Sequence, residues 1–272
     1  MLLASCLLLF GGSCDLSAKL DFKSPISLPA PDPEAPAKAA ASIRLEPGLG
    51  LTVRPSYLGV TGTVSDVFGA AAGATEAVVT ESGSGGAVAL EWRRGDIVGT
   101  IVAERPDGGA VMYLPAFWSQ GESRLEGNGV IWLGPGAYRK LADTGEIDWS
   151  LGLPAEAAAM KAEKILADFN RIAASLSGAG AAAPASPFAV KLKGEAAAFP
   201  VRVDGRIEHV RALLASGWFA DYVILKNPSN PLILKVSVNP LALSALDAFK
   251  ALGADPRAVG YEITAIALPK AK

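Results

Sequence analysis

The sequence predicts a strand-dominated α+β fold from three observations. Short runs of β-branched and aromatic residues recur about every ten residues between positions 43 and 132. Asp204-Gly205 lies between two alternating runs, which is a strong hairpin signal. Residues 154–176 carry apolar side chains at helical spacing. We therefore expect two antiparallel sheet regions, each a sandwich or an open barrel, bridged by one amphipathic helix and followed by a C-terminal helix and strand.

The first β-rich domain is expected to cover residues 43–153. Its strand patterns are separated by turn clusters rich in Gly, Asp and Ser. They lie at residues 77–80, 87–92, 97–102 and 110–114. Equal spacing and short turns favour an antiparallel meander.

A helix and a linker are expected over residues 154–186. Pro154 suits the first position of a helix, and Ile165, Phe169 and Ile172 form an apolar stripe. The stretch after Gly178 is rich in Ala, Gly, Pro and Ser, which is typical of a linker.

The last part of the chain, residues 187–272, is expected to form an α+β domain. The Asp-Gly pair joins runs 199–203 and 206–210, and an Asn/Pro-rich loop joins runs 222–225 and 232–238. Asn239 then suits a helix N-cap, and residues 261–266 follow as a final strand.

The N-terminus has the pattern of an exported protein. Residues 2–14 are an apolar run that ends in small residues and a cysteine, Gly11-Gly12-Ser13-Cys14. This pattern resembles the lipobox of bacterial lipoproteins. The resemblance implies a signal peptide over residues 1–13, cleavage before Cys14, acyl chains on that cysteine and a periplasm-facing position in the cell envelope. The Pro/Ala-rich segment that follows makes 14–42 an expected anchor and tether.

Two features leave the processed cysteine open. Gly11 stands where the family usually has Leu, whereas Leu3-Ala4-Ser5-Cys6 fits the pattern better but leaves no room for a leader. No Lys or Arg precedes Cys14, which favours a true start upstream of Met1 and would allow lipidation at Cys6 instead.

Composition excludes several function classes. The formal net charge is −2, which gives no basic footprint for nucleic acid. Both cysteines lie in the first 14 residues and His209 is the single histidine, so a thiolate or multi-histidine metal site in the body is excluded. No dinucleotide or phosphate-loop fingerprint occurs, and we expect no cofactor.

Two motifs are candidate sites. Asp143-Thr144-Gly145 resembles the active-site triplet of retroviral-type aspartic proteases, although Glu146 and the helical pattern of 135–141 fit that family poorly. Phe117 and Trp118 lie among polar neighbours in a predicted loop, where exposed aromatic side chains would form a contact site.

The sequence thus predicts an envelope-tethered protein with a non-catalytic binding or assembly role. The contact surface would be a sheet face or the Phe117-Trp118 loop. Besides the membrane, the expected partner is a small apolar ligand or an envelope protein. The alternative is a carboxylate-based hydrolase, and within that class first an aspartic-type peptidase that uses Asp143.

Overall fold

The fold is described from a computed structural model of the chain. The model describes residues 32–56, 73–83, 87–104, 111–127, 129–151, 189–217, 220–238 and 260–270. The predicted leader with Cys6 and Cys14, the bridging helix 154–176 and the helix after Asn239 lie outside these residues.

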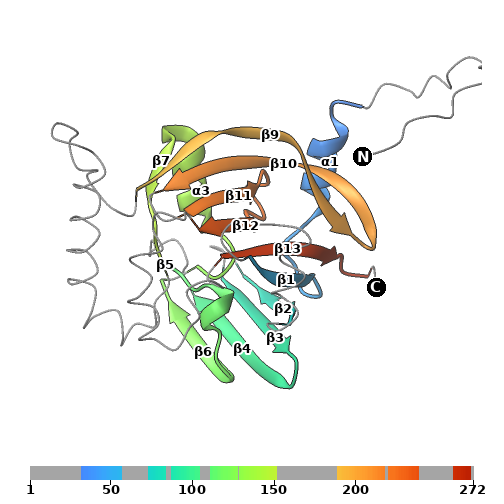
Figure 1. The fold of residues 1–272 in the computed structure, drawn as a ribbon, viewed down its shortest axis with the longest axis vertical. Coiled ribbons are helices and arrows are strands. Elements are labelled where there is room, and N and C mark those ends of the chain that lie inside the picture. Colours follow the sequence, from blue (N-terminus) through green and yellow to red (C-terminus); the bar gives the residue numbers. More distant parts are fainter. Residues whose placement is uncertain are drawn as a thin grey trace, which may run out of the picture. The chain divides into compact units, whose positions relative to one another are not determined.

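A large mixed sheet dominates the described residues and confirms the predicted α+β class (Figure 1). Its strand order is β6-β4-β3-β2-β1-β13-β12-β11-β10-β9-β7. The bounds are β1 Gly50–Ser56, β2 Thr75–Ser82, β3 Val88–Arg94, β4 Ile97–Glu104, β6 Gly121–Glu126, β7 Glu146–Asp148, β9 Ala189–Val203, β10 Arg206–Gly217, β11 Ala220–Leu225, β12 Ile233–Val238 and β13 Gly260–Ala267. The short strands β5 (Val111–Met112) and β8 (Ser150–Leu151) pair separately.

Five strands close on themselves at one end of the sheet. β9 to β13 pair in chain order, and β13 also pairs with β9 in parallel, with Ile266 opposite Val203. We call β9, β10, β11, β12 and β13 the ring. The predicted Asp204-Gly205 turn joins β9 to β10, and both residues have positive φ, as a two-residue hairpin turn requires. Asp204 fastens the closure: its backbone N–H donates to the carbonyl of Ile266, and its carboxylate accepts from the N–H of Leu268.

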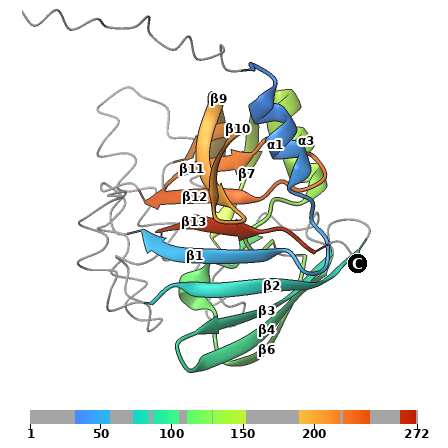
Figure 2. The same cartoon turned by 90° about the vertical axis from the view of Figure 1, so that its right-hand side faces the viewer.

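The other end of the sheet stays open. We call β2, β3, β4 and β6 the wing. β2, β3 and β4 form the predicted antiparallel meander, whereas β6 pairs with β4 in parallel, from Gly99 opposite Gly121 to Glu104 opposite Glu126. The connection from β4 to β6 is long and contains the 3-10 helix η3 (Pro115–Phe117), as a parallel pairing requires. The wing tilts away from the ring, as expected of a twisted sheet (Figure 2).

The two predicted domains are parts of one sheet. β1 pairs with β2 on one side and with β13 on the other, so residues 43–153 and 187–272 share a hydrogen-bonded ladder. Residues Pro33–Lys272 form one compact unit. The predicted boundary between two separate domains is therefore wrong, because pairing over more than 200 residues of chain joins the sheet regions.

The predicted tether 14–42 is also wrong at its C-terminal end. Ala35–Ser42 form helix α1, which packs against β10. Pro36 lies in the first turn, where proline is tolerated because that N–H has no intrahelical partner. Ala40 and the following Ile43 are fully buried in the core, which makes this Ala-rich segment part of the folded body.

Buried amides hold the C-terminal end of α1. The Asn227 side chain donates to the carbonyl oxygens of Ala40 and Ile43, each at 3.0 Å. Asn230 donates to the carbonyl of Ile43 at 2.9 Å and accepts from the Trp132 indole N–H at 2.7 Å. These bonds satisfy carbonyl groups that a helix end leaves without intrahelical partners.

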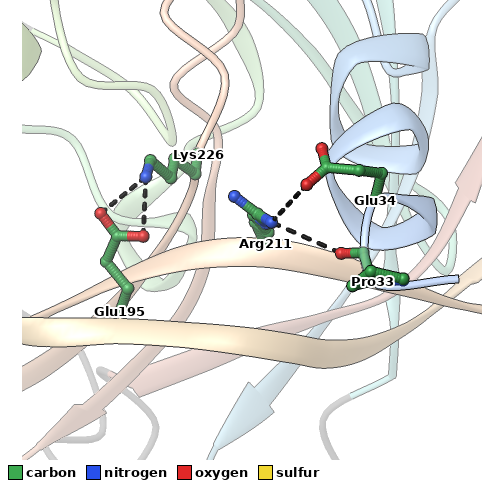
Figure 3. Close-up of polar contacts among 5 residues, drawn as sticks. All are labelled: Pro33, Glu34, Glu195, Arg211 and Lys226. Carbon is green, nitrogen blue, oxygen red and sulfur yellow. Dashed lines mark hydrogen bonds and ion pairs between the residues drawn. The ribbon is translucent and has the colours of Figure 1, made fainter. Parts of the chain in front are cut away.

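Ion pairs fasten the N-terminal end of α1 and the neighbouring strands (Figure 3). Arg211 on β10 donates to the carbonyl of Pro33 at 3.4 Å and to the Glu34 carboxylate at 3.3 Å. Lys226 contacts both carboxylate oxygens of Glu195 on β9, at 2.6 and 2.7 Å. Both pairs are partly exposed, so we expect each to contribute less to stability than the buried amides.

Candidate functional site

The predicted Phe117-Trp118 contact loop is not exposed. Phe117 is 9% and Trp118 4% exposed, and the Trp118 ring lies 5.8 Å from that of Trp92. The Trp118 indole donates to the carbonyl of Tyr113, and the Tyr113 hydroxyl donates to that of Phe117. The prediction of a contact site here is wrong, because the loop folds back onto the inner face of the wing.

Asp143 lies in a helix rather than in an extended active-site loop. Helix α3 spans Pro135–Thr144 and ends at Gly145, which has φ 76°. The Thr144 hydroxyl donates to the carbonyl of Lys140, and Asp143 is exposed on the last turn. The triplet is a helix C-terminus with a glycine cap, which does not favour a peptidase role.

The single histidine and the Arg94-Gly95-Asp96 turn offer no reaction centre. His209 is exposed on β10, opposite Pro200 of β9, with Glu208 exposed beside it. Arg94 is held inside: its guanidinium donates to the Thr75 hydroxyl at 2.8 Å. Its guanidinium carbon also lies 5.6 Å from the centre of the Trp92 ring, and burial lowers the Arg94 pKa.

The outer face of the wing is an exposed sheet surface that carries a hollow. Side chains alternate along each strand, as expected of a sheet with one solvated face. On β2, Ala77 and Val79 are buried whereas Val78 is 44% exposed; on β4, Ile101 is buried whereas Val98 is 47% exposed. Val78 on β2 and Val98 on β4 therefore face solvent, with β3 between their strands.

A groove of about 550 Å³ lies over this face. Its lining includes Val78 and Val98, together with Thr100 of β4 and Gly121 at the start of β6. Gly99 also lines the groove, and the Trp92 indole lies so close to it that an added Cβ would be 2.7 Å from the indole nitrogen. The hollow is partly open to solvent rather than enclosed, a shape that suits a contact with a chain better than enclosure of a small ligand.

Charged groups surround the two valines. Glu76, Glu91 and Glu122 line the groove, and Arg93 is the basic side chain among its lining residues. The strand register places Glu76 opposite Arg93 and Glu91 opposite Thr100. Glu91 and Arg93 on β3 therefore lie between Val78 on β2 and Val98 on β4, and the groove is a mixed surface with an excess of carboxylates.

The ring encloses aromatic side chains instead of presenting them. Trp149 stacks on Tyr222 with ring centres 4.7 Å apart, and Tyr261 lies next to Tyr222 across β12. Burial raises the pKa of Tyr222, with a smaller contribution from Asp221, and burial with the neighbouring Tyr222 raises that of Tyr261. The Tyr261 hydroxyl has no hydrogen-bond partner in the described part of the chain. This cluster is a core feature, since its side chains are out of reach of solvent.

Within the described ranges, no group of three or more His, Cys, Asp or Glu side chains has a metal-binding arrangement. The described helices also include none with the length and hydropathy of a membrane span. Comparisons with protein-family models, with curated proteins and with solved structures gave no match to this chain. The sequence predicts a sheet face as one contact surface, but its local patterns do not indicate which strands leave a face uncovered.

Proposed function

We propose that this protein is an envelope-tethered, non-catalytic binding or assembly protein whose contact surface is the outer face of the wing. The observation that carries the proposal is the groove on this open sheet face, where Val78 and Val98 are exposed among charged side chains. Exposed apolar side chains rimmed by polar groups are typical of a surface that contacts another molecule. The buried positions of Phe117 and Trp118 leave the sheet face as the supported one of the two predicted surfaces.

The anchor part of the proposal rests on the leader pattern that ends at Cys14. Metabolic labelling with palmitate in a bacterial host tests it. We expect the full chain to incorporate the label and to sediment with membranes, and Cys14→Ser to lose both properties. Labelling that persists in Cys14→Ser but disappears in Cys6→Ser would move the anchor to Cys6, and absence of label from the full chain would contradict an anchor.

The contact part of the proposal is tested by site-specific photo-crosslinking in intact cells. A photoreactive residue in place of Val98 is expected to give one discrete adduct. The same residue in place of Ile207 is the matched control, because Ile207 is 65% exposed on the ring hairpin and outside the groove. Equal adducts from both positions, or none from Val98, would contradict the proposed surface.

A further inference from the structure

Strand β6 ends the sheet at the wing. It pairs with β4 on one side, and the sheet order contains no described strand on its other side. An edge strand presents backbone N–H and C=O groups to which another chain can add as a further strand. The six residues of β6 offer an edge of about 20 Å, which matches a short extended peptide.

The outer face beside this edge is acidic. The register places four carboxylates and two guanidinium groups on the outer positions of β3, β4 and β6. They are Glu91, Glu104, Glu122 and Glu126, with Arg93 and Arg124. The Arg124 Nε donates to Glu122 at 2.6 Å, and the carboxylates of Glu122 and then Glu104 raise the pKa of Arg124. The excess negative charge therefore lies along the edge itself.

The inner face beside the same edge is apolar. Ser123 and Leu125 alternate with the charged positions of β6 and are half-buried, and Leu125 packs against the core. A strand added beside β6 would place every second side chain next to Leu125 and the others next to Glu122 and its neighbours. The edge thus matches a chain in which apolar and basic residues alternate.

We propose that the wing docks an extended segment of a partner protein in which Lys or Arg alternates with apolar residues, and that this segment adds as a strand to β6. Its basic side chains lie against the carboxylates of the outer face, and its apolar side chains cover Leu125. This inference rests on the proposed function and names the partner chemistry of the same surface.

Charge selects this occupant over the alternatives. Phosphate-bearing polymers and anionic lipid would meet the carboxylates of Glu91, Glu104 and Glu122 and be repelled. A second copy of the wing would bring the same excess of carboxylates to the shared edge. A basic extended segment is the occupant that neutralises the face while it completes the sheet.

The test uses the full chain and a fluorescent peptide of about eight residues in which lysine and valine alternate, with binding measured by anisotropy. Two matched probes accompany it: the same peptide with alternate amides N-methylated, and one with glutamate in place of lysine. We expect the lysine peptide to bind, and both changes to weaken binding by about tenfold or more, because they remove edge hydrogen bonds and charge attraction, respectively. Affinity should also fall as salt rises.

Protein variants locate the contact. The double variant Glu104→Gln with Glu122→Gln is expected to bind the lysine peptide about threefold to tenfold more weakly. Glu208→Gln, an exposed carboxylate on the ring, is the control and should leave the affinity unchanged. Circular dichroism should show that all variants keep the fold, since these side chains are exposed.

The results separate this inference from the proposed function. A discrete adduct from Val98 with no binding of the lysine peptide, or with equal binding of the N-methylated and glutamate peptides, would overturn the inference and leave the proposed surface standing. If neither the Val98 adduct nor peptide binding is observed, both the proposed function and this inference are contradicted. A doubled mass in native mass spectrometry that Val98→Glu abolishes would assign the outer face of the wing to a second copy of the chain and overturn the partner segment.

Discussion

The ring and the wing share one sheet but solve the problem of sheet edges differently. The ring closes β9 onto β13, so neither strand is left as an edge there, and no residue of β12 is exposed. The wing ends at β6 and leaves alternate residues of β2, β3 and β4 in solvent. Within the ring, β12 is therefore covered on both sides, although β9 and β10 keep exposed residues, whereas the wing keeps one face and one edge available. This difference underlies our proposal that the wing, and not the ring, carries the contact surface.

The largest expected effect on stability comes from the Asn230 side-chain amide, which links the ring to the end of α1. Asn230→Ala leaves the Trp132 indole N–H and one bond to the Ile43 carbonyl unmade in the core. We expect a loss of about 3 kcal/mol in the free energy of unfolding, measured by urea denaturation. Ser229→Ala, at an exposed neighbouring position, should change stability little, and an equal loss in both variants would contradict this account.

The second-largest loss of stability is expected at alkaline pH, through the buried tyrosines of the ring. Burial keeps Tyr222 and Tyr261 neutral in the folded state, with pKa values above the usual 10. Their contribution is complete below pH about 10 and is lost as the pH rises through the higher folded values, because only the unfolded state releases these protons. The expected slope is about 1.4 kcal/mol per pH unit for each tyrosine. In Tyr222→Phe the slope measured by denaturation at each pH should fall; an unchanged slope would contradict the assignment.

Within the wing, Gly99→Ala is expected to cost about 2 kcal/mol by overpacking. The new methyl group would lie 2.7 Å from the Trp92 indole nitrogen. A thermal melt of the single variants and of Gly99→Ala with Trp92→Leu gives the coupling between the two sites. If the double variant loses at least as much stability as the two single variants together, the contact with Trp92 is not the cause of the destabilisation by Gly99→Ala.

Loss of the hydrogen bond that the Asp204 carboxylate makes at the ring closure should have a smaller effect on stability. Asp204→Ala removes the carboxylate that accepts from Leu268 and places alanine at φ 46°. We expect a loss of about 1 kcal/mol by urea denaturation. Asp204→Asn keeps an acceptor and tolerates this backbone conformation, so it should be close to the parent protein. If Asp204→Asn loses as much stability as Asp204→Ala, the side-chain oxygen and the backbone conformation are not responsible for the loss.

The smallest effect is expected on the exposed face. Val78→Ala should change stability by less than about 0.5 kcal/mol, because Val78 is 44% exposed. Val79→Ala, one residue further on β2 and 1% exposed, should cost about 2 kcal/mol. Chemical denaturation of this pair compares the two faces of one strand, and equal losses would show that the outer face is covered in solution.

Local sequence signals predicted the fold well where the structure depends on neighbours in the chain. The Asp204-Gly205 hairpin and the loop between β11 and β12 are both confirmed, because turn chemistry decides them. The closure of β9 on β13 and the union of β1 with β13 depend on strands far apart in sequence. No local pattern reports such pairings.

The errors at the candidate site have the same physical origin. Pro and Ala in the segment before Ile43 suited both a tether and a short helix, and the buried amides of Asn227 and Asn230 decide for the helix. Polar neighbours suggested that Trp118 was exposed, whereas its packing on Trp92 buries it. The groove could not be found in advance, since it depends on four strands that meet only in the sheet.

Amide hydrogen exchange with and without the alternating lysine-valine peptide tests the central comparison most directly. The account predicts slower exchange in β6, over Gly121–Glu126, when the peptide is bound, and unchanged exchange in β11 and β12 of the ring. Protection confined to the ring, or equal protection across both regions, would contradict the assignment of the contact surface to the wing.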